Sequence, residues 1–178
     1  MHNKIPHTFT FISDFKKEEI LKLDRNIGII FRNYDKFPNK KILLELKNFC
    51  KAHKRSIYLS NNIKLSITLG FDGVYLPSFN KNPEVKGYNL KKNFIIMGSA
   101  HNLSEIKYKE NQGVEIIFIS PLFQTKNYKK KLDIIKFNIL SQFTKKKIIA
   151  LGGINNHNIK KLKMTNAYGF SGISYFLK

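Results

Sequence analysis

The sequence predicts an α/β fold, a (β/α)8 barrel with eight parallel strands in a single domain over residues 1–178. Short apolar runs, typical of buried strands, alternate with segments of helical spacing along the whole chain, which indicates a parallel sheet. About eight such runs are present, whereas an open doubly wound sheet commonly has about five or six strands. The chain is shorter than most barrels, which take about 250 residues, and it stops at the eighth run. We therefore expect a shortened TIM barrel that lacks the final helix.

The first half of the chain alternates between the two patterns. Residues 27–31 form a continuous apolar run, as expected of a strand that is buried on both faces. Apolar side chains then recur at helical spacing over residues 42–52, among them Leu43, Leu46 and Cys50. Further strands are expected at residues 7–12, 56–59 and 73–76, helices at 16–23 and 63–69, and a loose segment at 80–92.

The second half carries a clearer pattern. Residues 114–119 are the most β-branched run of the chain and predict a buried strand. The strand at 94–97 is expected to end at Gly98 and Ser99, and the strand at 147–151 at Gly152 and Gly153. Helices are predicted at residues 103–111, 132–143 and 157–164, and the last strand at residues 172–176.

Composition excludes several classes of protein. Hydrophobic residues make up 42% of the chain, which is too many for a disordered protein. No apolar run approaches the roughly 18–20 residues that a membrane span requires, and the first residues do not resemble a cleavable export signal. The single cysteine, Cys50, excludes an internal disulfide and a zinc site built from cysteines, and it is expected in the core. We therefore expect a cytoplasmic protein.

The net charge of +20 allows two interpretations. Lysines could neutralise the phosphates of a nucleic acid, or the composition could reflect a bias toward Lys, Asn and Ile from an AT-rich genome. The lysines are spread over the whole chain, and no RNA-binding signature or zinc-finger spacing is present. A nucleic-acid partner is therefore not expected. A basic surface would still attract phosphorylated small molecules.

The residues that follow the predicted strands suit the binding of anions. In a parallel barrel the chemistry takes place at the carboxyl ends of the strands. These positions are poor in carboxylates and rich in groups that bind phosphates through N–H donors, hydroxyls and fixed positive charge. No cluster of His and Asp has the spacing of metal ligands. The positions are Arg32, Asn33, Ser60, Asn61, Asn62, Pro77, Ser78, Asn80, Ser99, His101, Asn102, Ser120, Pro121, Gln124, Thr125, Lys126, Gly152 and Gly153.

Single positions in this set also have structural alternatives. An arginine directly after a buried run, as Arg32 is, requires a partner. His101 is the best-placed titratable group, but a histidine at a strand end is often a structural residue. Gly152 and Gly153 would either bind a phosphate or form a tight turn before a helix. Asp72 precedes its strand, so capping or a turn is expected there.

Four segments carry a resemblance to a known family. Residues 71–78 read FDGVYLPS, residues 98–102 GSAHN, residues 119–125 ISPLFQT and residues 150–154 ALGGI. In order and spacing they resemble the thiamine-phosphate synthase and thiazole tautomerase superfamily of (β/α)8 barrels, over residues 27–176. The resemblance implies an enzyme of thiamine biosynthesis, a transferase that joins hydroxymethylpyrimidine pyrophosphate to thiazole phosphate and releases pyrophosphate. In the family, Mg2+ assists this reaction.

The resemblance also implies roles for individual residues. Arg32 matches the arginine that faces the pyrophosphate or pyrimidine, and Ser99 matches a serine of that pocket. Thr125 matches a threonine of the loop that holds the thiazole, and Gly153 the glycine that contacts the thiazole phosphate. We predict catalytic roles for Arg32, Ser99 and His101. Substrate-binding roles are predicted for Asn61, Ser78, Asn80, Thr125, Lys126, Gly152 and Gly153, and no metal ligand is predicted.

Several family positions are changed in this chain. The two carboxylates that bind Mg2+ in the family fall on Asn61 and Asn80, and a neutral amide is a poor ligand for a hard cation. Mg2+ is therefore implied by the resemblance alone. The glutamine and lysine that flank the family arginine fall on Ile30 and Tyr34, the second threonine and the lysine of the thiazole loop on Asn127 and Tyr128, and the Val-Ser after the last strand on Phe176 and Leu177.

Two alternatives to the synthase remain open. Residues 76–78, Leu-Pro-Ser, are closer to the tautomerase branch, which isomerises a thiazole phosphate without metal, and His101 would be the proton shuttle. That branch has a catalytic histidine after the sixth strand, where this chain has Pro121. The barrel could also bind a phosphorylated thiamine precursor without catalysing a reaction. A homodimer is expected if the missing helix leaves the first and last strands uncovered.

Overall fold

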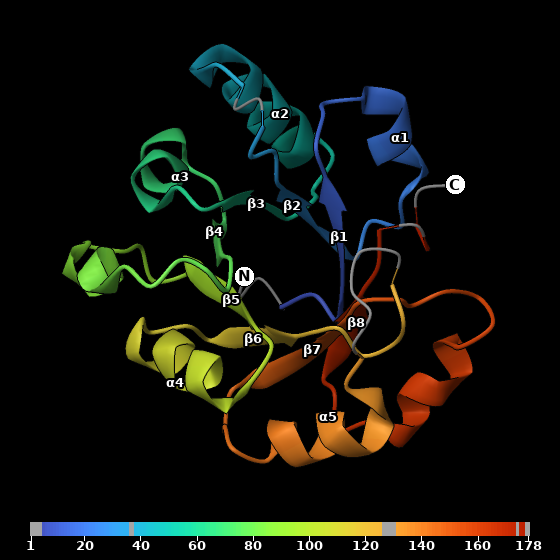
Figure 1. The fold of residues 1–178 in the computed structure, drawn as a ribbon. Helices are drawn as coiled ribbons and strands as arrows, with labels where there is room; N and C mark the ends of the chain where they lie inside the picture. The colour runs from blue at the N-terminus through green and yellow to red at the C-terminus, as the bar shows by residue number, and fades with distance from the viewer. Residues whose placement is uncertain (1–4, 36–37, 126–130, 174, 177–178) are drawn as a thin grey trace.

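The computed structural model describes residues 5–35, 38–125, 131–173 and 175–176, and it shows the predicted barrel (Figure 1). Within these residues eight parallel strands follow one another around a closed ring, and the last strand pairs with the first. The helices surround this ring on the outside. The fold class predicted from the sequence is confirmed. The strands are β1 (Thr8–Ile12), β2 (Ile27–Phe31), β3 (Ile57–Ser60), β4 (Gly73–Leu76), β5 (Ile95–Ala100), β6 (Ile116–Ile119), β7 (Lys147–Leu151) and β8 (Gly169–Ser171).

Short helices connect most of the strands. They are α1 (Lys17–Lys22), α2 (Lys40–Ala52), α3 (Ile63–Leu69), α4 (Leu103–Asn111) and α5 (Asp133–Ser141), with 3-10 helices η1 (Pro83–Gly87) after β4 and η2 (Ile159–Met164) after β7. The helix predicted at residues 157–164 is thus present at Ile159–Met164, as a 3-10 helix. Just before η2, two asparagine side chains accept hydrogen bonds from backbone N–H groups: Asn158 Oδ1 from Asn155 N, and Asn155 Oδ1 from His157 N. None of the helices in the described ranges is long and apolar enough to span a lipid bilayer.

Asparagine caps explain where α2, α3 and α4 begin. The side-chain oxygens of Asn39, Asn62 and Asn102 each accept a hydrogen bond from the backbone N–H three residues later, at 2.9–3.0 Å. Such a cap satisfies one of the N–H groups that the first turn of a helix leaves unpaired. At the other end of α3, Gly70 adopts the left-handed conformation with φ of 73°, which glycine accepts at little cost.

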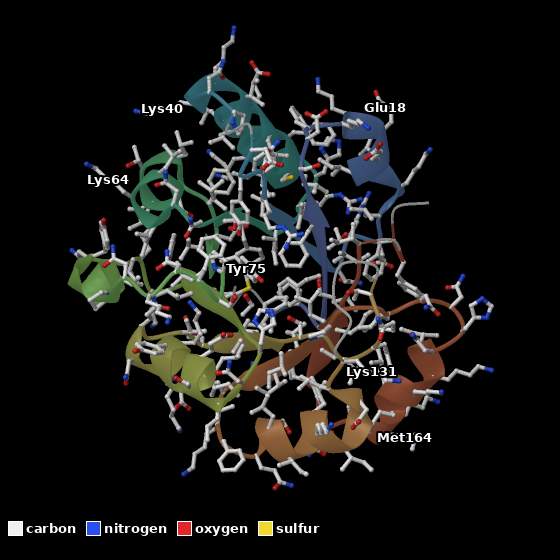
Figure 2. All side chains as sticks on the ribbon, in the orientation of Figure 1. Glu18, Lys40, Lys64, Tyr75, Lys131 and Met164 are labelled. Carbon is white, nitrogen blue, oxygen red and sulfur yellow. The ribbon has the colours of Figure 1, made fainter. Side chains whose placement is uncertain are left out.

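The interior of the barrel is filled mainly by aromatic and branched side chains. Phe9, Tyr58 and Phe118 are almost completely buried, and the Phe9 and Phe118 rings meet edge to face with centroids 5.2 Å apart. Figure 2 shows Tyr75 near the centre of the ring, whereas Lys40, Lys64 and Met164 point outward from the surrounding helices. The strand residues of opposite orientation form two further clusters under the helices. Strands β2 to β6 are therefore buried on both faces along their whole length, as their apolar runs predict.

Two residues outside the mouth have structural roles: Cys50 has the core role expected of it, whereas Asp72 links two strands instead of forming a cap or a turn. Cys50 lies in the cluster under α2, and burial raises the pKa of its thiol to about 12, so it is a core thiol. Asp72 Oδ2 accepts a hydrogen bond from the backbone N–H of Ile57 at 2.8 Å. Burial raises the pKa of Asp72, and the bond joins the start of β4 to the start of β3.

Two strand boundaries differ from the prediction. β5 continues through Ser99 to Ala100, because Gly98, Ser99 and Ala100 all pair with β6. β8 comprises residues 169–171, and the apolar run at 172–176 that predicted it comes after the strand. The residues that directly follow β8 are thus Gly172 and Ile173. The family's Val-Ser pair, which comes after the last strand, was matched to Phe176 and Leu177, several residues too far along the chain. Leu177 itself lies outside the described residues.

Aromatic side chains cover part of the outside of β8. Phe170 of β8 stacks on Phe176, with ring centroids 5.6 Å apart, and Tyr175 meets both rings edge to face. None of the described residues after β8 is helical. Thr10 and Ile12 of β1 are buried. The bare surface from which a homodimer was predicted is therefore partly covered, and the dimer stays a prediction.

The close contact between β4 and β5 makes Gly73 essential to the barrel. A Cβ at residue 73 would overlap the backbone carbonyl of Ile95 on β5, and backbone cannot move without breaking the strand pairing. We expect Gly73→Ala to lower the free energy of unfolding by about 2 kcal/mol or more, as measured by urea denaturation. Gly87→Ala is the matched control, because a Cβ there would meet no atom within 4 Å. Equal effects of the two substitutions would contradict this account.

Candidate active site

A cavity of about 380 Å³ lies at the carboxyl ends of β2, β3 and β4. This is the end of a barrel at which catalysis takes place. A second hollow of about 400 Å³ lies at the opposite end of the barrel, beside Lys147 at the start of β7. The first cavity is therefore the candidate active site. It is lined by Asn33, Tyr34, Ser60, Asn61, Asn62 and Phe79.

Arg32 directly follows β2 and is fixed at this end of the barrel. Its backbone N–H donates to the carbonyl of Ile12 at 2.8 Å, and its guanidinium carbon lies 4.4 Å from the centre of the Phe11 ring. The partner that the sequence requires for this half-buried arginine is thus an aromatic ring. A ring face does not use the N–H donors of a guanidinium group, so Arg32 can still bind an anion such as a phosphate.

Asn61 and Asn80, which the resemblance places at the family's metal positions, bind each other. Asn80 Nδ2 donates to Asn61 Oδ1 at 2.7 Å, although the residues follow different strands. Asn61 has a φ of 60°, a left-handed conformation that asparagine tolerates better than most residues. Within the described ranges no group of three or more His, Cys, Asp or Glu could hold a metal ion. A neutral amide pair of this kind does not fit Mg2+, which prefers carboxylate oxygens.

Aromatic side chains form the outer wall of the cavity. The Tyr34 hydroxyl and Ser60 Oγ are 2.8 Å apart, and the Tyr34 and Phe79 rings meet edge to face with centroids 5.5 Å apart. Burial raises the pKa of Tyr34, against smaller opposite effects of Ser60 and Arg32, so the phenol stays protonated at neutral pH. Phe79 was not predicted as a site residue. Its position directly after Ser78, beyond the end of β4, is the signal that could have identified it.

His101 is held at the start of α4 by Glu105. The backbone N–H of His101 donates to Glu105 Oε2 at 2.8 Å, and His101 Nδ1 lies 2.9 Å from the same oxygen. Burial acts to raise the pKa of Glu105, but the hydrogen bonds from His101 and Asn102 outweigh it and lower that pKa. These contacts favour the structural alternative for His101, and its catalytic role stays a prediction.

Ser99 and Ser78 occupy different depths of the barrel. Ser99 is only 5% exposed and lies two residues after Met97 on β5, on the same face of the strand as this residue of the interior cluster. It therefore faces the inside of the barrel near its carboxyl end. Ser78 is half-buried in the loop after β4, next to Phe79 of the cavity wall.

Gly152 and Gly153 form a tight turn against the segment that follows β6. Both have positive φ values, 98° and 69°. A Cβ on either glycine would overlap the loop after β6, at Pro121 for Gly152 and at Phe123 and Gln124 for Gly153. Phe123 N also donates to the Gly152 carbonyl at 3.0 Å. These contacts show a tight turn, which is followed by the 3-10 helix η2, and the phosphate-binding role of the two glycines stays a prediction.

The thiazole side of the predicted site is described in part. Thr125 is half-buried just beyond Gln124, so it lies close to the turn at Gly153. Lys126, and with it Asn127, Tyr128 and Lys129, falls outside the described residues. The structure thus brings Asn61, Asn80 and the Arg32 segment together at one side of the mouth, and Thr125, Gly152 and Gly153 at another.

A closed (β/α)8 barrel with a polar, carboxylate-poor mouth defines a class of barrel proteins that suits phosphorylated small molecules. Residues 25–176 match the family described as thiamine monophosphate synthase, and the chain belongs to this family. The resemblance stated from the sequence is thereby confirmed.

Individual relatives agree with this assignment. A protein of Aquifex aeolicus, named as a second and provisionally assigned thiamine-phosphate synthase, is 32% identical over 141 residues, covering 78% of this chain and 75% of its own. The thiamine-phosphate synthase of Prochlorococcus marinus is 27% identical over 152 residues, which cover 83% of this chain but 44% of that protein. The solved thiamine phosphate pyrophosphorylase of Pyrococcus furiosus shares the fold, with a TM-score of 0.76, 20% identity, and coverage of 97% and 87%.

The pairing of His101 with Glu105 predicts a pH-dependent contribution to stability. A carboxyl group whose pKa is lowered by folding stabilises the fold above its ordinary pKa, here 4.5, and loses that effect as the pH falls through the lowered value. We expect Glu105→Gln to cost about 1 kcal/mol of unfolding free energy at pH 7 and progressively less as the pH falls below 4.5. Urea denaturation over a series of pH values from 7 downward measures this. Glu45→Gln, at an exposed position of α2, is the control, and a pH-independent loss in Glu105→Gln would refute the account.

Proposed function

We propose that this chain is a thiamine-phosphate synthase that joins hydroxymethylpyrimidine pyrophosphate to thiazole phosphate and releases pyrophosphate. The match of residues 25–176 to the family carries the proposal. The mouth is compatible with it, since the reaction requires no strong base and needs donors and positive charge around the leaving pyrophosphate. The chain would act as one domain over residues 1–178, which the pairing of β8 with β1 supports. A cytoplasmic location belongs to the same proposal.

Each side of the mouth would hold one substrate. Arg32 would bind the pyrophosphate and stabilise its negative charge as it leaves, with Ser99 in the same pocket. Asn61, Ser78 and Asn80 would line the pyrimidine side. Thr125, Lys126, Gly152 and Gly153 would hold the thiazole phosphate.

The proposed role of Arg32 predicts a loss of turnover when its charge is removed. A charge-assisted hydrogen bond contributes about 1.5–3 kcal/mol, so we expect Arg32→Ala to lower kcat/KM by about 10- to 100-fold. The measurement is thiamine phosphate formation from both substrates. Arg25→Ala is the control, because Arg25 is exposed just before β2, at the opposite end of the same strand. Unchanged turnover in Arg32→Ala would show that Arg32 does not bind the pyrophosphate.

The amide pair predicts weak Mg2+ binding that carboxylates would strengthen. Asn61→Asp combined with Asn80→Asp places two carboxylates where the amides now meet 2.7 Å apart. We expect this variant to bind Mg2+ at least about tenfold more tightly than the natural chain by calorimetric titration, because carboxylates are the preferred ligands. Repulsion between the two new carboxylates should also lower the melting temperature of the variant, and added Mg2+ should reverse this loss. Asn33→Asp adds a charge to the same cavity without the pair, and an equal gain there would oppose the prediction.

A binding protein that has lost catalysis is the second candidate function. The hydrogen-bonded Asn61–Asn80 pair favours it, because the family's metal carboxylates are missing. The synthase assay, run with and without Mg2+, separates the two. Thiamine phosphate formation establishes the synthase, whereas tight binding of thiamine phosphate without turnover establishes the binding protein.

A further inference from the structure

Lys109 is a buried cation that the proposed reaction does not use. It lies on α4, and its side chain is 0% exposed, which is rare for lysine unless the charge is partnered. The aliphatic stem passes over Gly98 of β5, where a Cβ would lie 2.7 Å from Lys109 Cδ. Glycine at this position therefore makes room for the lysine between helix and strand.

The ammonium group of Lys109 binds the loop after β4, residues 77–82, which we call the β4 loop. Lys109 Nζ donates to the backbone carbonyls of Pro77 at 2.8 Å and Asn80 at 2.7 Å. It also donates to Gln112 Oε1 at 2.9 Å. An ammonium group has three N–H donors, so these acceptors use all of them. Lys109 consequently holds the loop and does not itself contact a substrate.

Gln112 strengthens the same attachment. Its Nε2 lies 2.8 Å from the carbonyl of Asn82 and 3.3 Å from Asn80 Oδ1. Asn80 in turn donates to Asn61 at the cavity, so hydrogen bonds run without interruption from α4 through the β4 loop to the mouth. Burial lowers the pKa of Lys109 to about 8, and the ammonium form therefore still predominates near pH 7.

We propose that Lys109 and Gln112 form a positioning clamp that fixes the β4 loop and thereby shapes the pyrimidine side of the cavity. The loop carries Phe79, which lines the cavity, and Asn80, which bonds to Asn61. Without the clamp, the loop would lose the contacts that hold its backbone to α4. The choice of substrate side rests on the proposed function, whereas the attachment of the loop does not.

Lys109→Met tests the clamp, because methionine fills most of the space of the stem and donates no hydrogen bond. We expect backbone hydrogen exchange at Asn80 and Asn82 to become about tenfold faster or more. In the synthase assay we expect KM for the pyrimidine pyrophosphate to rise about tenfold, with KM for the thiazole phosphate changed less than about twofold. A purely structural lysine would lower stability without this separation of the two KM values.

Ile106→Ala is the matched control, since Ile106 is equally buried on α4 but belongs to the apolar cluster. It should lower the melting temperature without changing exchange in the β4 loop. If Lys109→Met does not fold, Gln112→Ala removes the second half of the clamp and must give the same pattern. Unchanged exchange at the loop, or the same rise in KM in Ile106→Ala, would overturn the inference. If no product forms with any protein, the proposed function fails, and hydrogen exchange alone decides the clamp.

Discussion

The closed ring of strands depends on a short junction between β8 and β1, which begins at the pair of Thr8 and Phe170. Gly169 is needed at this junction because a Cβ there would overlap the carbonyl of His7. Closure leaves the sheet without an edge, and it turns the carboxyl ends of all strands toward one rim. Asn61 and Asn80 meet at this rim because they follow the neighbouring parallel strands β3 and β4. The mouth is a property of the ring, and no single loop could form it.

Apolar runs that alternate with helical segments were enough to predict the ring, because a strand that is covered on both faces requires a nearly continuous apolar sequence. The last strand was misplaced for a physical reason. Residues 172–176 contain Tyr175 and Phe176, which read as strand residues, but these rings pack on the outside of Phe170 instead. A short strand such as β8 contributes few apolar residues to the pattern, whereas tertiary packing decides where the aromatic ones go.

The sequence could predict which residues lie at the mouth, but only part of the contacts that their side chains make there. Strand ends located Arg32, Asn61 and Asn80 correctly, yet periodicity says nothing about the bond between the two amides. The burial of Lys109 could not be predicted at all, because a lysine in a helix rich in charged residues is expected to face the solvent. Its burial follows from a glycine on a strand and from acceptors on a distant loop, and neither is visible in the pattern of α4.

The packing of Lys109 on Gly98 ties two positions of the chain together in evolution. A side chain at residue 98 would collide with the lysine stem, with Cβ and Cδ only 2.7 Å apart. A lineage that keeps lysine at 109 is thus confined to glycine at 98. A shorter residue at 109 would remove this contact and give up the ammonium group, whereas the Leu76 carbonyl oxygen, 3.1 Å from the same Cβ, would still crowd a larger residue at 98. The wall of the barrel is thus confined here from two sides, and loss of the lysine alone does not open it.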